Sequence, residues 1–132
     1  QLRIDATTKR LLVDASASVS ASTSGGFTAY RNASLSNTAV AVKTSAGSLY
    51  YYHVENPNAS KAYIQFYDVA QASVTVGTTT PTYSFFVPAG GALDTALTVP
   101  ALFGTALTIA ATTTAGGGTA PSTALIVNLG YK

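Results

Sequence analysis

The chain has 132 residues, and its seven Lys or Arg and five Asp or Glu residues give a formal net charge of +2. This weak charge argues against nucleic acid as a partner. No apolar run approaches the ~20 residues that span a bilayer, so we expect no membrane partner either. The chain contains no cysteine, which excludes disulfides, thiolate zinc sites and cysteine catalysis. Eight Tyr and five Phe supply bulky core material for one domain.

The N-terminal segment differs in composition from the rest of the chain. Residues 2–4 alternate apolar and polar side chains, residues 7–10 form a polar turn, and residues 11–13 are a short apolar run. Residues 15–26 then contain only Ala, Ser, Val, Thr and Gly, a composition typical of a flexible linker. We therefore predict an arm and a linker at 1–26 and a β-sandwich domain at 27–132.

An arm this short cannot form a stable sheet by itself, because an isolated hairpin is marginal in water. We expect it to add to a sheet edge on its own subunit, on a sister subunit or on another protein. The residues expected to contact this partner are Leu2, Arg3, Ile4, Lys9, Arg10, Leu11 and Val13.

Eight later segments are strand candidates, most of them with apolar side chains at every second position. This period indicates strands with one buried face. We predict an all-β fold, an antiparallel, jelly-roll-like β-sandwich of about eight strands. A seven-stranded immunoglobulin-like topology is the main alternative. The predicted strands are Phe27–Arg31, Thr38–Lys43, Ser48–Glu55, Lys61–Asp68, Thr82–Val87, Ala92–Val99, Ala106–Thr112 and Ala124–Tyr131.

Glycine and proline mark the connections between these strands. Asn56-Pro57-Asn58 predicts a turn, and Pro100 and Gly104 are expected to bracket the connection after the sixth strand. Two connections are long. Residues 69–81 include a candidate for a further short strand at Val74–Val76, and residues 112–122 predict a mobile, glycine-rich loop.

The search for catalytic chemistry finds no consistent set of residues. His53 has Glu55 nearby in the sequence, and Asp68 is a second possible carboxylate partner, but nothing selects a nucleophile and no Gly-x-Ser-x-Gly motif is present. The triple glycine at 116–118 lacks the Gly-Lys-Ser/Thr ending of a phosphate-binding loop. We therefore expect no enzymatic activity, no cofactor and no metal site.

Two segments match the acceptor pattern for N-glycosylation, Asn32-Ala33-Ser34 and Asn58-Ala59-Ser60. A chain this rich in Ser and Thr produces such matches by chance. No secretion signal accompanies them, so we discount both.

Aromatic residues gather on two neighbouring predicted strands. Alternation places Ile64 and Phe66 on one face, and Tyr63, Gln65 and Tyr67 on the other. The second face is a further buried sheet surface, an oligomer interface or a sugar-binding platform, since Tyr combines a large area with a polar tip. Tyr63 and Tyr67 therefore join the residues expected to contact a partner.

Several motifs resemble, in their order and spacing, small structural proteins of tailed bacteriophages. The first is Gly47-Ser48-Leu49-Tyr50, followed by Asn56-Pro57-Asn58 and the segment Tyr63–Asp68. The later ones are Val76–Pro81, Pro88–Gly91, Ala110–Thr114, Ala120–Ser122 and Val127–Lys132. The resemblance covers about residues 47–132, and the segment 7–13 also looks like the start of such proteins. It implies a β-sandwich virion protein in the manner of capsid cement or decoration proteins.

Arm, sandwich and resemblance together lead to an expected role. We expect a non-enzymatic structural protein that binds and stabilises a bacteriophage capsid, located on the capsid surface of the virion. The expected partners are the major capsid protein or another virion protein, and sister copies in a dimer or trimer. The alternative is a carbohydrate- or receptor-binding module of a phage head fibre or tail.

Overall fold

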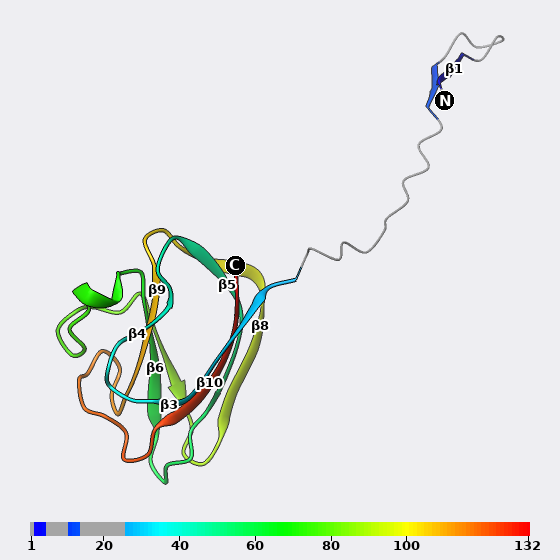
Figure 1. Ribbon diagram of the computed structural model, residues 1–132. Helices are drawn as coiled ribbons and strands as arrows, with labels where there is room; N and C mark the ends of the chain where they lie inside the picture. The colour runs from blue at the N-terminus through cyan, green and yellow to red at the C-terminus, as the bar shows by residue number, and fades with distance from the viewer. Residues whose placement is uncertain (1, 5–10, 14–25) are drawn as a thin grey trace.

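The computed structural model describes residues 2–4, 11–13 and 26–132 of the chain, and its main body is a sandwich of two four-stranded sheets (Figure 1). The first sheet has the order β3 (Thr28–Leu35), β10 (Leu125–Tyr131), β5 (Gly47–Glu55) and β8 (Ala92–Phe103). The second has the order β4 (Val40–Lys43), β9 (Leu107–Thr112), β6 (Ala62–Tyr67) and β7 (Tyr83–Val87). All neighbouring strands in both sheets are antiparallel.

The predicted antiparallel β-sandwich is confirmed. Each of the eight predicted strand segments overlaps one strand of the two sheets, and the eight strands do not fit the seven-stranded alternative. Two further short strands, β1 (Leu2–Ile4) and β2 (Leu11–Val13), pair with each other in an antiparallel ladder.

Strand β8 is longer than the sequence predicts. It continues through Pro100 to Phe103, whereas the sequence predicts a connection between Pro100 and Gly104. The prediction is wrong because β8 lies at the edge of its sheet, where a proline without an N–H breaks no ladder. Its pairing with β5 shifts between Ala96 and Ala101, so the residues between them bulge out of the ladder.

The segment between β6 and β7 also differs from the prediction. A short 3-10 helix, η1 (Gln71–Ser73), and turns occupy it, and no strand forms at Val74–Val76. The side-chain amide of Gln71 donates to the carbonyl of Ala39, at 2.9 Å, and holds the segment near β4. No helix in the described residues is long and apolar enough to cross a membrane.

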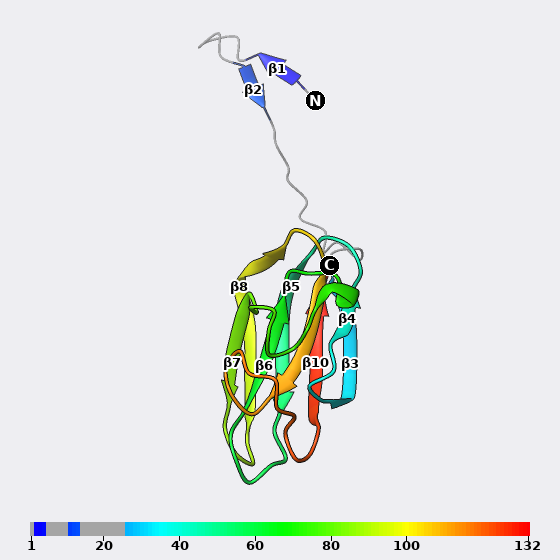
Figure 2. The ribbon, with the colours of Figure 1, turned by 90° about the vertical axis from the view of Figure 1, so that its left-hand side faces the viewer.

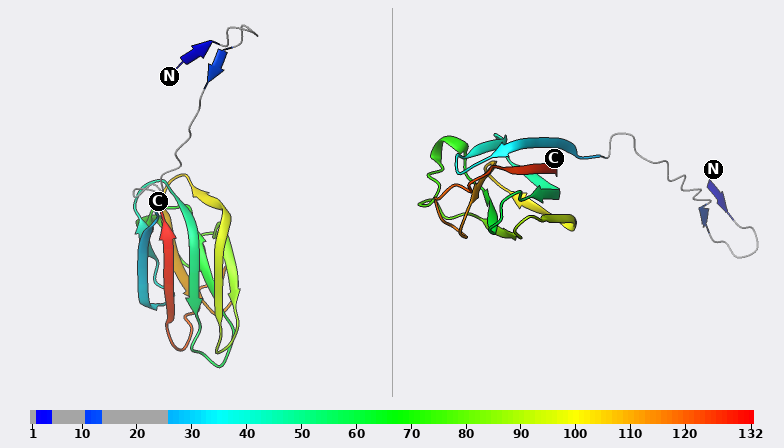
Figure 3. Two further views of the ribbon diagram at one scale, coloured as in Figure 1. Left: turned by 90° about the vertical axis from the view of Figure 1, so that its right-hand side faces the viewer. Right: turned by 90° about the horizontal axis from the view of Figure 1, so that it is seen from below.

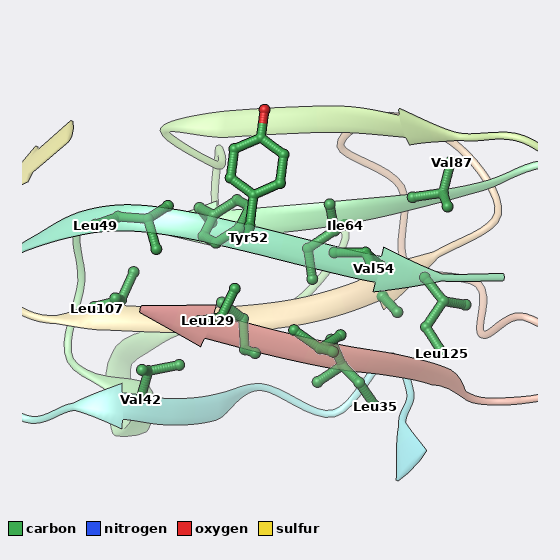
Figure 4. Close-up of a cluster of buried hydrophobic side chains, with 14 of the residues drawn as sticks. Leu35, Val42, Leu49, Tyr52, Val54, Ile64, Val87, Leu107, Leu125 and Leu129 are labelled. Atoms are coloured by element: carbon green, nitrogen blue, oxygen red, sulfur yellow. The ribbon is translucent and has the colours of Figure 1, made fainter. Parts of the chain in front are cut away.

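The core lies between the two sheets, where the inward side chains of both meet (Figure 4). Phe66 is at its centre, with ring centroids of Tyr52, Phe85 and Phe103 at 6.2, 5.7 and 6.4 Å. Burial of each large apolar side chain contributes about 1.5–3 kcal/mol. The fully buried apolar residues of this cluster include Leu35, Val54, Ile64, Val87, Leu107, Ile109, Leu125 and Val127.

Candidate functional site

The residues predicted to grip a partner from the arm fall in two groups. Leu2, Arg3 and Ile4 lie in β1, and Leu11 and Val13 lie in β2, with Leu2 paired to Val13 and Ile4 paired to Leu11. The other group, Lys9 and Arg10, lies outside the described residues, as does most of the predicted linker. Partner binding by the arm remains a prediction.

Tyr63 lies on the outer face of the second sheet, half-buried and accessible. Its ring meets Phe86 edge to face at 5.8 Å, and Phe86 is 50% exposed. Two aromatic rings from neighbouring strands thus form a small surface patch. This position is compatible with the predicted partner contact of Tyr63.

Tyr67, the second predicted contact on this face, is fully buried, so the prediction that it touches a partner is wrong. Its hydroxyl donates to Gln65, whose amide in turn donates to the hydroxyl of Thr112 and the carbonyls of Thr114 and Gly117. Burial also raises the pKa of the Tyr67 hydroxyl. Of the three readings left open for this face, a second buried sheet surface holds at Gln65 and Tyr67.

Two long connections cover this part of the face (Figures 1 and 2). They pack against each other so closely that a Cβ on Gly77 would lie 2.8 Å from the Cα of Gly118. Asn37 donates to the carbonyl of Gly118, at 2.8 Å, and fixes the glycine-rich loop from a third side. The loop predicted as mobile is therefore held in place. The alternation of side chains within β6 does not indicate that two connections cover this face.

Two residues noted in the sequence have structural roles. Asp68 accepts hydrogen bonds from the backbone N–H groups of Gly104, Thr105 and Ala106 at 2.8, 2.6 and 3.2 Å. Asn58 is buried and bonded to Asn56, so it is not available as a glycan acceptor. Both side chains hold connections together.

The first sheet turns its outer face toward the viewer in Figure 3 (left), and a row of polar residues crosses this face. Strand register aligns Arg31 on β3 with Asn128 on β10, Asn128 with His53 on β5, and His53 with Asp94 on β8. One residue from each strand thus forms a line across the whole sheet. The positive charge lies at the β3 edge and the carboxylate at the β8 edge.

His53 lies between two carboxylates in this row. Its Nε2 is 3.1 Å from Glu55 and its Nδ1 is 3.8 Å from Asp94. Partial burial and a hydrogen bond to Asp94 raise the pKa of the neighbouring Tyr51. Within the described ranges no group of three or more acidic, His or Cys residues could hold a metal ion. His53 therefore takes part in a surface network with Glu55 and Asp94, and Asp68 is engaged elsewhere.

An aromatic pair stands beside the polar row. The rings of Phe27 and Tyr51 stack at 6.3 Å with an interplanar angle of 10°. Phe27 lies directly over Gly130 on β10, where any Cβ would overlap its ring. Phe27 remains 51% exposed. This face combines a flat aromatic surface with charged and amide groups.

A third surface is an apolar groove between the edges β7 and β8. It encloses about 280 Å³ and reaches down to the core residues Leu49 and Tyr52. Val99, in the bulge of β8, lines the groove and is 78% exposed, and Tyr83 on β7 lines it from the other side. The remaining lining residues are Phe85, Leu97, Pro100 and Ala101. No local pattern in the sequence indicates this groove, because it forms between two edge strands that belong to different sheets.

Comparisons of the chain with protein-family models, with curated proteins and with solved structures find no match. A functional proposal for this protein therefore rests on the surfaces that its structure presents. They are an apolar groove, an aromatic pair at Tyr63 and a polar face on the first sheet, all suited to binding other molecules.

Proposed function

We propose that this protein is a structural virion protein that binds and stabilises a bacteriophage capsid, a cement or decoration role without enzymatic activity. The observation that carries the proposal is the apolar groove, because Val99, which lines it, exposes most of its surface beside two open sheet edges. Contiguous exposed apolar surface of this kind marks a site that another protein covers. The resemblance of residues 47–132 to phage structural proteins supports a virion protein as that partner.

The proposed attachment uses two regions. The groove and the aromatic pair of Tyr63 and Phe86 provide apolar contacts to the major capsid protein. The N-terminal arm adds a strand to a neighbouring sheet edge. A decoration protein of this kind belongs on the capsid surface, where it needs a stable domain and binding surfaces but no cofactor.

We further propose that the sandwich is a jelly roll. Six of the seven connections between consecutive sandwich strands pass from one sheet to the other, and only β6 and β7 are successive strands within one sheet. In each sheet the last strand lies between the first two, β10 between β3 and β5, and β9 between β4 and β6. This nested order of eight strands supports the jelly-roll assignment.

Re-decoration of particles tests the role of the groove. Capsids that lack this protein are incubated with the wild-type chain or with Val99→Asp, and bound protein is quantified after sedimentation. Because the Val99 side chain is exposed, the variant should fold, yet its apparent affinity should fall at least about tenfold. Ala89→Asp, in the exposed turn after β7, is the matched control and should bind normally. Normal occupancy by the folded Val99→Asp variant would refute the groove as the attachment site.

One observation favours the alternative, a carbohydrate-binding module of a head fibre or tail. Phe27 and Tyr51 present stacked rings beside Asp94 and Asn128, a combination that suits a sugar ring and its hydroxyls. Titration of host-surface polysaccharide, followed by NMR shifts of the Phe27 and Tyr51 rings, tests this alternative. Unchanged ring signals at saturating polysaccharide would exclude binding at this face.

A further inference from the structure

The outer face of the first sheet has opposite charges at its two edges. Arg31 is on β3, while Asp94 is on β8 and Glu55 is on the adjacent β5. Three strand spacings, about 14 Å, separate β3 from β8, so Arg31 cannot reach Asp94 in its own chain. Among the described residues Arg31 forms no ion pair, whereas His53 bridges Glu55 and Asp94. In the part of the chain that the structure describes, the guanidinium of Arg31 therefore has no carboxylate partner at the β3 edge, whereas Asp94 offers one at the β8 edge.

We propose that this face binds a second copy of the same chain in a two-fold symmetric dimer. A two-fold axis parallel to the strands lays β3 of one copy over β8 of the other, and β10 over β5. Arg31 then faces Asp94 of the second copy, and Asn128 faces His53. The single row becomes two Arg–Asp pairs and two Asn–His pairs.

The charge pattern selects this axis over the other face-to-face arrangement. An axis perpendicular to the strands would lay each strand over its own counterpart, which brings Arg31 toward Arg31 and Asp94 toward Asp94. Like charges placed together across an interface cost free energy and suppress that arrangement. Only the strand-parallel axis makes the row self-complementary.

The aromatic pair gives the proposed dimer an apolar centre. In the adjacent register row, Gly130 and Tyr51 occupy the two middle strands, with Ala29 and Ala96 at the edges. Phe27 covers Gly130, so the same axis places Phe27 and Tyr51 of one copy opposite Tyr51 and Phe27 of the other. Four rings then cover one another, and the small alanines let the edges approach. An apolar centre with charged pairs toward the rim is the usual anatomy of a protein interface.

The size of the face predicts a weak dimer in solution. Four strands at ~4.8 Å spacing give a face about 19 Å wide, and strands of about seven residues make it about 24 Å long. Each copy would then bury about 450 Å², an area at the low end for a specific interface. Association should therefore depend on concentration. It would strengthen where many copies are held close together on one surface.

A charge-reversal cycle on the full chain tests the dimer without any capsid. Sedimentation velocity between about 1 μM and 1 mM should show dimerisation of the wild type. Arg31→Asp and Asp94→Arg should each raise the dissociation constant at least about tenfold. The combined variant Arg31→Asp/Asp94→Arg should recover most of the loss. Lys61→Asp, an equal charge change at an exposed position after the Asn-Pro-Asn turn, is the control and should dimerise normally.

Three outcomes would overturn the proposal: a monomeric wild type at about 1 mM, a folded combined variant without recovery, or dimerisation that requires added oligosaccharide. Circular dichroism checks the fold of each variant. If a reversed variant does not fold, Phe27→Ser decides, because normal dimerisation of this folded variant also contradicts the proposed centre. The groove variant Val99→Asp should dimerise like the wild type, so failure of capsid binding and failure of the dimer are distinguishable.

Discussion

At the scale of single residues, Asp68 shows how one side chain holds a connection. Its carboxylate accepts the backbone N–H groups that begin the turn between β8 and β9, in a hydrogen-bonded arrangement that favours the ionised form. The N–H of Thr105, with those of Gly104 and Ala106, holds the pKa of Asp68 below its usual range. A carboxylate bonded to three backbone groups links the end of β6 to the start of β9.

This lowered pKa predicts an acid-sensitive contribution to stability. The contribution of Asp68 is present above the ordinary carboxyl pKa of about 4 and is lost as the pH falls through the lower folded-state value. Asp68→Ala should lower the free energy of unfolding at neutral pH by about 1–2 kcal/mol and flatten this part of the acid limb. Urea unfolding between pH 2 and 7 measures both effects. A variant with wild-type stability at every pH would contradict this role.

Tyr67 and Tyr63 form a matched pair of one buried and one accessible hydroxyl. Tyr67→Phe removes the donor to Gln65 and leaves the oxygen of that buried amide unsatisfied, which should cost about 1–3 kcal/mol. Tyr63→Phe should change stability by less than about 0.5 kcal/mol, because its side chain is accessible to water. Thermal unfolding of the two variants gives the comparison. Equal stability of both would place Tyr67 outside the buried network.

At the scale of elements, β10 is a central strand between β3 and β5. Val127 points into the core and is fully buried, while Asn128 points to the outer face. Val127→Asp should cost several kcal/mol, since it buries an unpaired charge, and Asn128→Asp at low protein concentration should cost far less. Chemical unfolding distinguishes them. Retained thermal stability of Val127→Asp would contradict the inward placement.

The sequence predicts an element well when local patterns determine it, and poorly when its position in the whole sheet determines it. Alternation within a strand is local, and the period of two at Leu125–Tyr131 led directly to β10. The continuation of β8 past Pro100 depends on its edge position, which is a property of the whole sheet. The cover over Tyr67 depends on two connections that meet at Gly77 and Gly118.

The candidate surfaces also divide into those that a local pattern indicates and those that depend on the order of the strands. The alternation of the strand and its aromatic residues predict a partner contact at Tyr63, and this side chain is accessible. The groove joins β7 and β8 from different sheets, and the polar row joins residues 31, 53, 94 and 128 through strand order. Neither grouping exists in the linear sequence until the register of the strands is known.

At the scale of the whole molecule, we expect the arm and the sandwich to have separable roles. All sandwich strands lie between Thr28 and Tyr131, so deletion of residues 1–24 should leave a folded β domain. We expect this truncated chain to lose binding to capsids that lack the protein, since two or three buried apolar side chains are worth about 1.5–3 kcal/mol each. Sedimentation of the particles with the truncated chain measures the loss. Normal occupancy would instead assign attachment to the groove and the Tyr63–Phe86 patch alone.

The copy number of this protein in purified virions tests the capsid role most directly. A decoration protein repeats with the symmetry of the shell, so quantitative mass spectrometry against the major capsid protein should give on the order of hundreds of copies per particle. About a dozen copies or fewer would place the protein on a tail or fibre, and its absence from the particle would contradict a structural virion role altogether.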